Sequence, residues 1–356
     1  MDLSSKVFSG KYLPSQWVNR KPVQVNVYKV ALNTICPNTK LIGQITRSTN
    51  TTSFLLYGSR KYYVCQFAPP ASEKVVFPWE EKYNPRKFDG AIERMAHLKS
   101  HGICVPTIRS RGSISINDLE RQYIVTDFVK GIGADILLSE HPNMKLKVYF
   151  EFGKTLSKLT KVPLKEDVTL PSNDIILTKI KHAGEFISHL GCITPKQAKR
   201  LIIKVEDRLN LLGNQPASYV HLDPTPTNLH INYKKDSVYV TLMDVEAFRV
   251  GHPIVEGLGK AVMIGIYDWY YLTNEDPTTI QTTVNAFLDG YSLNLPYAQR
   301  VKRSKNDLEW LIETCRLIHL PQSIMYEYKK DTSYFATDEK STKWSIKVLH
   351  ELLSDS

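Results

Sequence analysis

The apolar periodicity of this 356-residue chain changes near residue 130. Up to about Val129, short runs rich in β-branched and aromatic residues alternate with polar turns, which is typical of β-strands. Beyond that point, apolar residues recur every three to four positions over long stretches, which is typical of amphipathic helices. Strands grouped before helices predict an α+β chain with two lobes: a small antiparallel sheet lobe and a larger, mostly helical lobe.

The sheet lobe is expected over residues 1–130. "YGSRK" (57–61) predicts a hairpin turn between two strands, and "RGSISIND" (111–118) a polar turn between two others. One helix is expected at 84–102, where apolar residues share a face and Gly102 can end it. Two glycines in "KGIGA" (130–134) predict a hinge after the lobe. The five strand-like runs are 40–47, 50–58, 61–68, 103–110 and 121–129.

The helical lobe is expected over residues 131–356. Thr194 followed by Pro195, and Asp276 followed by Pro277, are typical of helix N-termini, because these side chains can cap the first turn. Helical spacing is found in 145–162, 194–212, 256–274, 276–293, 304–320 and 341–353. One β-like insert, "SYVHLDPTPTNLHINYKKDSVYVTLMDVEAF" (218–248), interrupts these helices.

The net charge of +10 lies in the first lobe, where residues 1–130 hold 19 Lys and Arg against 9 Asp and Glu. A basic lobe suits nucleic acid, an anionic membrane or a polyphosphate ligand, and it is also compatible with a plain solvated surface. No run approaches the roughly 20 apolar residues that cross a bilayer, and the N-terminus lacks a signal-peptide core. We therefore expect a soluble, cytoplasmic protein without a membrane partner.

The insert places oxygen donors where a strand and a hairpin end. Asp223 follows the strand "ASYVHLD", Asn228 ends the stiff loop "PTPTN", and Asp244 ends a hairpin that turns at "KKDS". A hairpin of this length brings Asn228 and Asp244 back towards Asp223. Carboxylates and phosphate oxygens are the ligands that Mg²⁺ prefers. The alternatives are an ordinary hairpin with turn-forming Asp and Asn, and a zinc site using His221, His230 and His252.

The string "HLDPTPTN" followed by "DVE" resembles the aminoglycoside phosphotransferase and choline kinase-like family, a small-molecule branch of the protein-kinase-like fold. The family pattern is H-x-D-x-x-x-x-N followed by D-x-E or D-x-D. The resemblance implies that Asp223 is the catalytic base. Asn228 and Asp244 become magnesium ligands, Glu246 a helper at the metal, and His221 a residue that holds the loop in shape.

The resemblance extends into the first lobe. "YIVTDFVKG" is similar to the segment that joins the lobes in this family, which implies that backbone groups of Asp127, Phe128 and Val129 meet the adenine. Glu93 is the implied partner of a phosphate-binding cation. The phosphates are expected under the loop "GQITRSTNTTSF", where Ser48, Thr49 and Asn50 stand in for the glycines that the family uses.

Gln66 departs from the family pattern, because it stands on the strand "KYYVCQFA" where a lysine or arginine normally binds the phosphates. A neutral amide cannot supply that charge stabilisation. Four other cations of the basic lobe are candidates to replace it: Arg47, Arg60, Lys61 and Lys74. An alternative is a catalytically impaired, pseudokinase-like protein that binds a nucleotide or another ligand.

The resemblance implies a phosphotransferase that uses ATP or GTP with Mg²⁺ to phosphorylate a hydroxyl of a small molecule, such as an antibiotic, an amino alcohol or a sugar-like compound. The helical lobe would supply the acceptor pocket, and its neutral charge attracts a polycationic antibiotic less than an acidic lobe would. Nucleic acid is not expected as a partner because no nucleic-acid module accompanies the basic lobe, and nothing in the sequence indicates the oligomeric state. Trp269, Tyr270 and Tyr271 suit either stacking on the acceptor or the core. The acids on that side are Glu256, Asp268, Glu275, Asp276, Asp307, Glu309 and Glu313.

Overall fold

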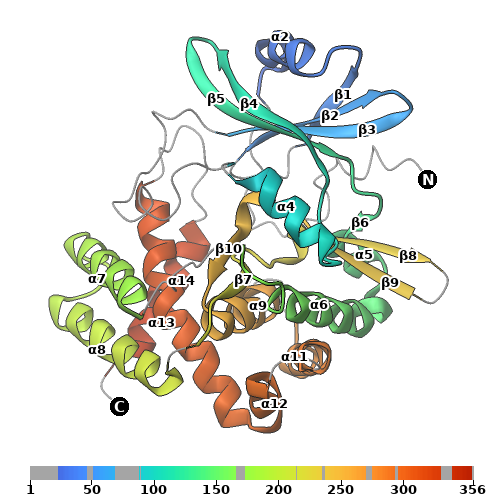
Figure 1. Cartoon of the computed structure of the whole chain (residues 1–356). Coiled ribbons are helices and arrows are strands. Elements are labelled where there is room, and N and C mark those ends of the chain that lie inside the picture. The colour runs from blue at the N-terminus through green and yellow to red at the C-terminus, as the bar shows by residue number, and fades with distance from the viewer. Residues whose placement is uncertain are drawn as a thin grey trace.

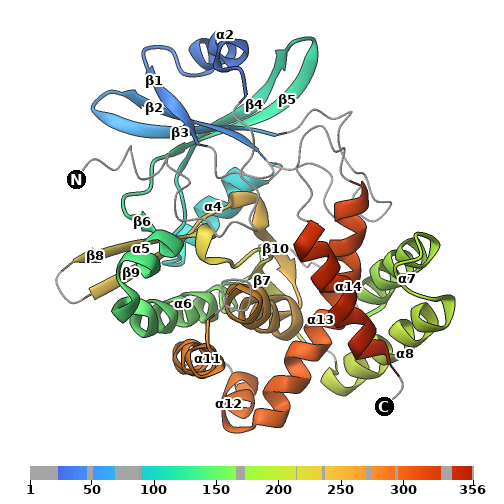
Figure 2. The same ribbon diagram turned by 180° about the vertical axis from the view of Figure 1, so that it is seen from behind.

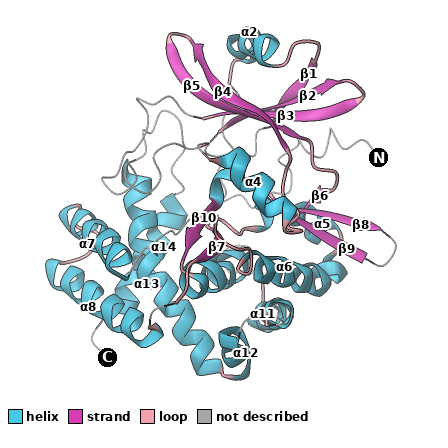
Figure 3. Ribbon diagram, in the orientation of Figure 1, coloured by secondary structure: helices cyan, strands magenta, loops and turns pink. Residues whose placement is uncertain are grey.

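The structure, a computed structural model, has a β-sheet lobe stacked on a helical lobe, as Figures 1 and 3 show. It describes residues 23–45, 51–68, 88, 90–165, 173–213, 215–234, 237–269, 275–292, 296–329 and 339–354. The predicted α+β class and the order of the two lobes are confirmed. The boundary at residues 130/131 stays a prediction.

The upper lobe is built on a five-stranded antiparallel sheet with the order β1-β2-β3-β5-β4. The predicted β2–β3 turn is confirmed at Ser59 and Arg60, whose positive φ angles of 50° and 60° suit a two-residue hairpin loop. The polar turn expected at 111–118 is wrong, because β4 runs to Ile116 and only Asn117 and Asp118 turn. The strands are β1 (Lys40–Ile45), β2 (Thr52–Gly58), β3 (Lys61–Phe67), β4 (Ile108–Ile116) and β5 (Leu119–Asp127).

A helix that the sequence did not predict, α2 (Val25–Ile35), covers the outer face of this sheet. Its Tyr28 ring lies 5.1 Å from that of Phe54 and 5.2 Å from that of Phe67. The segment "VNVYKVALNTI" is rich in β-branched residues, so local propensity does not favour a helix and packing on the sheet decides. Because strand side chains alternate, Cys65 and Phe67 face α2 while Gln66 faces the other lobe.

The lower lobe is helical, and two predicted helix starts are confirmed. Thr194 and Gln197 form a capping box, and Asp276 accepts a hydrogen bond from the Thr279 N–H at 2.9 Å. No helix among the described residues is both long and apolar enough to cross a bilayer. Figure 2 shows the helices from behind. They are α5 (Ala134–Glu140), α6 (Lys145–Leu159), α7 (Asn173–His189), α8 (Pro195–Leu212), α11 (Pro277–Tyr291), α12 (Pro296–Arg303), α13 (Lys305–Lys329) and α14 (Glu339–Leu353).

The helix expected at 256–274 has an unusual form. It consists of two π-helical segments, η5 (Pro253–Gly259) and η6 (Met263–Tyr267), joined by the short α9 (Lys260–Val262). Trp269 is buried in the core beyond it, so its role is packing, whereas Tyr270 and Tyr271 lie outside the described residues. Wide π-turns are often found at functional sites. This helix passes beneath the insert.

The insert and the hinge form two small sheets between the lobes. Strand β7 (Ser218–His221) pairs with β10 (Phe248–Gly251), and β8 (Leu229–Lys234) forms the predicted hairpin with β9 (Ser237–Leu242). The predicted hinge contains β6 (Ile132–Gly133), which pairs with β8. The helix α4 (Ala91–Ser100) lies between the upper sheet and β10 in Figure 1. These elements hold the ends of β7 and β9 at the junction of the lobes.

Two helices of the lower lobe approach so closely that only glycine fits between them. A Cβ atom on Gly290 of α11 would collide with the Phe150 carbonyl of α6, and one on Gly153 would collide with the Phe287 carbonyl. Gly290→Ala is expected to lower the free energy of unfolding by about 2–3 kcal/mol. Helix propensity alone would change it by about 1 kcal/mol in the opposite direction. Urea unfolding checks this, with the exposed Asn285→Ala as the control on α11; a stabilised Gly290→Ala protein would contradict the contact.

Candidate active site

His221 anchors the loop that follows β7. Its side chain is buried, its Nε2 donates to the Met243 carbonyl at 2.8 Å, and its ring stands edge-on to Phe248 with the centroids 4.7 Å apart. Burial lowers the pKa of His221, so its imidazole is neutral at pH 7. A buried, neutral ring with these contacts can position the loop. It does not reach out of the fold to act as an acid or a base.

Asp223 and Asn228 are in direct contact. The Asn228 amide Nδ2 donates to the Asp223 carboxylate at 2.7 Å and to the Asp223 backbone carbonyl at 2.9 Å. The turn η3 (Pro226–Asn228) bends the chain so that the two residues meet, and the Asn228 N–H donates to the Thr225 carbonyl at 2.9 Å. With its amide NH₂ group used in this way, Asn228 keeps its Oδ1 as an acceptor. That oxygen is of the kind that binds a divalent cation.

Asp244 is brought to the same place by the backbone of Met243. The Met243 N–H donates to the Asn228 carbonyl at 2.8 Å, while its carbonyl accepts from His221. Asp244 itself has φ 56° and ψ 74°, the left-handed region that few residues with a side chain adopt. Backbone in this region is concentrated at functional sites. The structure thus holds the side chains of Asp223 and Asn228 in contact and places Asp244 at the other end of the same hairpin, next to Asn228.

Glu246 and Arg249 lie close behind these residues. Glu246 is half-buried in the short turn η4 (Val245–Ala247), and Arg249 follows on β10. Burial lowers the pKa of Arg249 to about 10, with Arg94 acting in the same direction and Glu246 and Asp244 opposing it. The sequence analysis did not select Arg249. Its burial, which the sequence does not show, is what places its charge under the influence of Glu246 and Asp244.

The three histidines proposed for zinc have separate roles. His221 holds Met243, His230 contacts the Val129 carbonyl through Nδ1 at 3.3 Å, and His252 Nδ1 accepts from the Ile254 and Val255 N–H groups at the start of η5. Within the described ranges, no three His, Cys, Asp or Glu side chains gather as a metal site. A zinc site built from these histidines is therefore wrong.

Gln66 lies on the face of β3 that looks towards the helical lobe. Its Nε2 approaches the Ser53 hydroxyl at 3.4 Å, and Ser53 is its cross-strand neighbour. Two of the candidate substitutes for the missing cation, Arg60 and Lys61, lie at the far end of β3. Gln66 lies five positions beyond Lys61 on this strand, or about 16 Å away. The other two, Arg47 and Lys74, lie outside the described residues.

Glu93 and Arg94, adjacent residues of α4, have different charged neighbours. Glu93 is exposed and lies 3.9 Å from Arg111 of β4. Arg94 is half-buried, its charge acts on Arg249, and α4 packs against η4. Glu93 therefore pairs with a cation of the upper sheet, although not with one on β3. Its proposed role towards the phosphates stays a prediction.

The connection between the lobes already uses several of its backbone groups. The Asp127 N–H donates to the Thr107 carbonyl at 2.9 Å, the Phe128 N–H donates to the Tyr62 carbonyl at 3.0 Å, and the Val129 carbonyl receives His230. The Asp127 carboxylate forms a two-point ion pair with Arg109 at 2.6 and 2.7 Å. Among the described residues, no backbone hydrogen bond engages the Val129 N–H. Adenine binding at 127–129 stays a prediction, with that N–H as the available donor.

The predicted phosphate loop residues Ser48, Thr49 and Asn50 lie outside the described residues. The rest of the geometry defines a class of protein. The Asp223 carboxylate contacts the Asn228 amide, and Asp244 follows the residue that is hydrogen-bonded to Asn228, below a sheet whose inner face looks towards the helical lobe (Figure 1). Groups of this kind are suited to phosphoryl transfer, since that reaction needs positioning and charge stabilisation more than covalent chemistry.

Comparison with known proteins agrees with that class. Residues 44–292, more than half of the chain, match the phosphotransferase enzyme family APH, and the chain belongs to this family. It is a small-molecule phosphotransferase that acts on an alcohol group. A search of curated proteins finds no match.

Solved structures show the same fold. A microcompartment-associated aminopropanol kinase is 14% identical, with a TM-score of 0.55 over 93% of this chain and 95% of the other. Aminoglycoside phosphotransferase APH(2'')-Ib bound to ADP is 13% identical, with a TM-score of 0.56 over 93% and 98%. A thermostable mutant of aminoglycoside phosphotransferase APH(4)-Ia with AMP-PNP and hygromycin B is 12% identical, with a TM-score of 0.59 over 92% of this chain and 98% of the other. These similarities confirm the protein-kinase-like fold that the sequence analysis expected.

Proposed function

We propose that this protein transfers the γ-phosphoryl group of ATP or GTP, with Mg²⁺, to the hydroxyl of a small molecule. The observation that carries the proposal is the contact of Asn228 Nδ2 with the Asp223 carboxylate, next to Asp244. In the transfer, the acceptor oxygen forms a bond to the γ-phosphorus as the bond to the β-bridging oxygen breaks. The hydroxyl proton passes to Asp223, and the nucleoside diphosphate leaves.

The residues present fit a magnesium ion. Asp244 supplies a carboxylate and Asn228 an amide oxygen, and Mg²⁺ commonly takes one or two carboxylates together with phosphate oxygens. When bound, the ion would neutralise charge on the phosphates. Asp223 stays available to orient the hydroxyl because Asn228 fixes its carboxylate. His221 positions the loop, and Glu246 with Arg249 lies behind the metal ligands.

A screen of nucleotides and acceptors tests this function. ATP and GTP are each combined with Mg²⁺ and with amino alcohols, sugars and aminoglycosides, and diphosphate release and phosphorylated product are both measured. We expect the nucleotide with Mg²⁺ to raise the melting temperature and at least one acceptor to be phosphorylated. If no nucleotide stabilises the protein and no acceptor stimulates turnover, the catalytic proposal fails.

A second candidate is a catalytically impaired relative, and Gln66 is the observation that favours it. Gln66→Lys would place a cation on the inner face of β3, and we expect about tenfold tighter binding of ADP with Mg²⁺, which corresponds to about 1.4 kcal/mol. Calorimetric titration measures it. Gln24→Lys adds the same charge at an exposed position of the same lobe and is expected to change affinity little.

The result of Gln66→Lys separates two arrangements of the phosphates. Tighter binding means that they pass Gln66 and that the natural protein lacks a cation there. Unchanged or weaker binding would mean that they lie elsewhere, and the assignment of Gln66 to the nucleotide site would then be wrong.

A further inference from the structure

A half-buried lysine that the proposed mechanism does not use, Lys260, lies under the catalytic loop. It begins α9, between the two π-helical segments, and η5 packs against β7. The same helix touches the loop further on, since a Cβ atom on Gly265 would lie 2.6 Å from the Pro224 carbonyl. Burial lowers the pKa of Lys260, whereas the charge of Asp223 favours its protonated form. Lys260 and the proposed base are therefore electrostatic neighbours.

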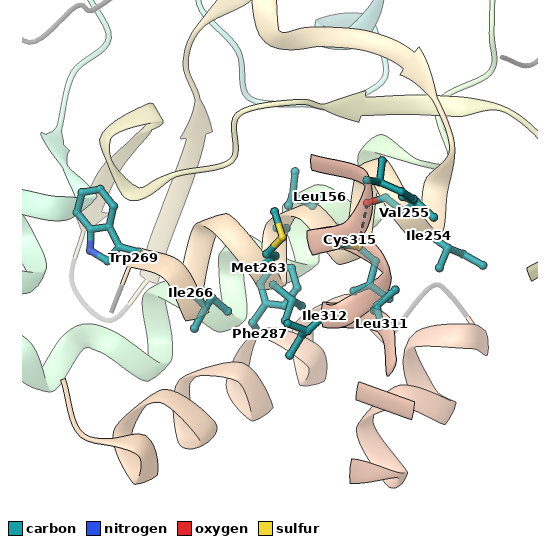
Figure 4. Packing of buried hydrophobic residues seen from close by; sticks show 14 of the residues in the cluster. Leu156, Ile254, Val255, Met263, Ile266, Trp269, Phe287, Leu311, Ile312 and Cys315 are labelled. Carbon is teal, nitrogen blue, oxygen red and sulfur yellow. Dashed lines mark hydrogen bonds between the residues drawn. The ribbon is translucent and has the colours of Figure 1, made fainter. Parts of the chain in front are cut away.

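A second element, α13, brings a histidine to Lys260. Cys315 of α13 donates through Sγ to the Val255 carbonyl at 3.6 Å and faces Gly259, the residue before Lys260, as Figure 4 shows for the Cys315–Val255 contact. His319 lies one helical turn beyond Cys315 on the same face. Burial, and then the charge of Lys260, lower the pKa of His319 well below its usual value, so it is neutral at pH 7.

A third element, α7, adds another lysine. This helix packs against α13, and the charge of Lys179 acts on both Lys260 and His319. Lys179 is half-buried. In the described part of the chain, neither lysine ammonium makes a hydrogen bond or an ion pair, and His319 Nε2 is buried without a hydrogen-bond partner. Two like charges and an unused imidazole nitrogen are therefore held together, an arrangement that an anion would stabilise.

The acids around this cluster are already engaged. Glu256 accepts from the His252 N–H at 2.9 Å, and its charge, like that of Asp223, acts on Lys260. Asp268 pairs with Arg316 of α13 at 3.2 Å. Of the acids that the sequence placed on the acceptor side, Asp276 caps α11. The others pair with cations: Glu275 with Lys145, Asp307 with Arg300, Glu309 with Lys305 and Glu313 with Arg208.

We propose that the acceptor is an alcohol carrying an anionic group, a carboxylate or a phosphate, and that Lys260, Lys179 and His319 bind this group beside Asp223. The inference rests on the proposed function, whose acceptor site it specifies. A polycationic acceptor would bring its positive charges towards Lys260 and Lys179, neither of which makes an ion pair among the described residues, and these like charges would repel it. The anionic group of the acceptor offers both of them a partner, with His319 as an additional hydrogen-bonding group.

Anion binding tests the site without requiring turnover. The donor side is first saturated with a non-hydrolysable triphosphate analogue and Mg²⁺, and sulfate and citrate are then titrated while the melting temperature is followed. We expect both anions to stabilise the natural protein. Lys260→Met is expected to weaken the binding of both anions at least tenfold. Lys179→Met, which leaves Lys260 in place, is expected to weaken it by a smaller factor. Lys199→Met, on an exposed face of α8, is the control and should behave as the natural protein does.

Either of two results would overturn the inference: no stabilisation by the anions, or the same stabilisation in Lys260→Met and Lys179→Met as in Lys199→Met. Paired acceptors give a second measurement, with glycerol against glycerol 3-phosphate and with kanamycin as a polycation. The anionic member should have the higher kcat/KM, and Lys260→Met should raise its KM more than it lowers kcat. Anion binding without any turnover would instead contradict the proposed function and leave the anion site standing.

Discussion

Asp223→Asn is expected to reduce phosphoryl transfer by about 10²- to 10⁴-fold, the usual contribution of a positioned general base. The substituted amide can still accept the hydrogen bond that Asn228 Nδ2 donates at 2.7 Å, so the loop should keep its shape. Only the ability to take the acceptor proton is removed. The affinity for ADP with Mg²⁺ should therefore stay within about twofold, because the nucleotide is held by other groups.

Single-turnover kinetics and calorimetry measure the two effects of Asp223→Asn separately. Asp207→Asn, on an exposed face of α8, makes the same chemical change away from the site and serves as the control. Transfer at close to the normal rate in Asp223→Asn would assign the base to another residue. An equal loss of transfer and of nucleotide affinity would indicate that the loop itself is disturbed.

Asp244→Asn is expected to remove most of the magnesium-dependent function. A carboxylate at the metal contributes several kcal/mol, so the rate of transfer should fall about 10³-fold. Unlike Asp223→Asn, this change should also weaken the binding of the nucleotide with Mg²⁺, and it should leave metal-free nucleotide binding nearly unchanged. Asparagine is the informative substitution because Asp244 has φ 56°, and asparagine tolerates this left-handed backbone better than alanine does.

The control for Asp244→Asn is Asp118→Asn. Asp118 lies in the β4–β5 turn with φ 60°, so it has the same left-handed backbone as Asp244 but is not a proposed metal ligand. Calorimetric titration of ADP with and without Mg²⁺ measures the effect. If Asp118→Asn and Asp244→Asn keep the same magnesium dependence, Asp244 does not hold the ion.

Much of the site could be predicted from the sequence because its residues are close together along the chain. His221, Asp223 and Asn228 lie within eight residues, and a hairpin of fixed length carries Asp244 back to them. Helix caps such as Thr194 were also predictable, since they depend on neighbouring residues. The helix α2 was not, because its segment has little helical preference and forms by packing its Tyr28 face on the sheet.

The residues that the sequence analysis missed are those whose role comes from contacts between distant elements. Lys260, Lys179 and His319 come from α9, α7 and α13, and nothing in their local sequence sets them apart from surface residues. Arg94 and its neighbour Glu93 point in different directions on α4, so that Arg94 is half-buried while Glu93 is exposed. The pairing of the acceptor-side acids was equally out of reach, because their partners come from other elements: Glu313 pairs with Arg208, Asp268 with Arg316, and Glu256 accepts from the His252 N–H.

We propose above all that Asn228 and Asp244 hold one divalent cation beside Asp223. Electron paramagnetic resonance of Mn²⁺, which substitutes for Mg²⁺ at oxygen sites, tests it most directly in the presence of a non-hydrolysable ATP analogue. The account predicts tight Mn²⁺ binding to the natural protein and to Asp118→Asn, and binding weakened at least tenfold in Asp244→Asn and in Asn228→Ala. Equal Mn²⁺ binding in all four proteins would contradict it.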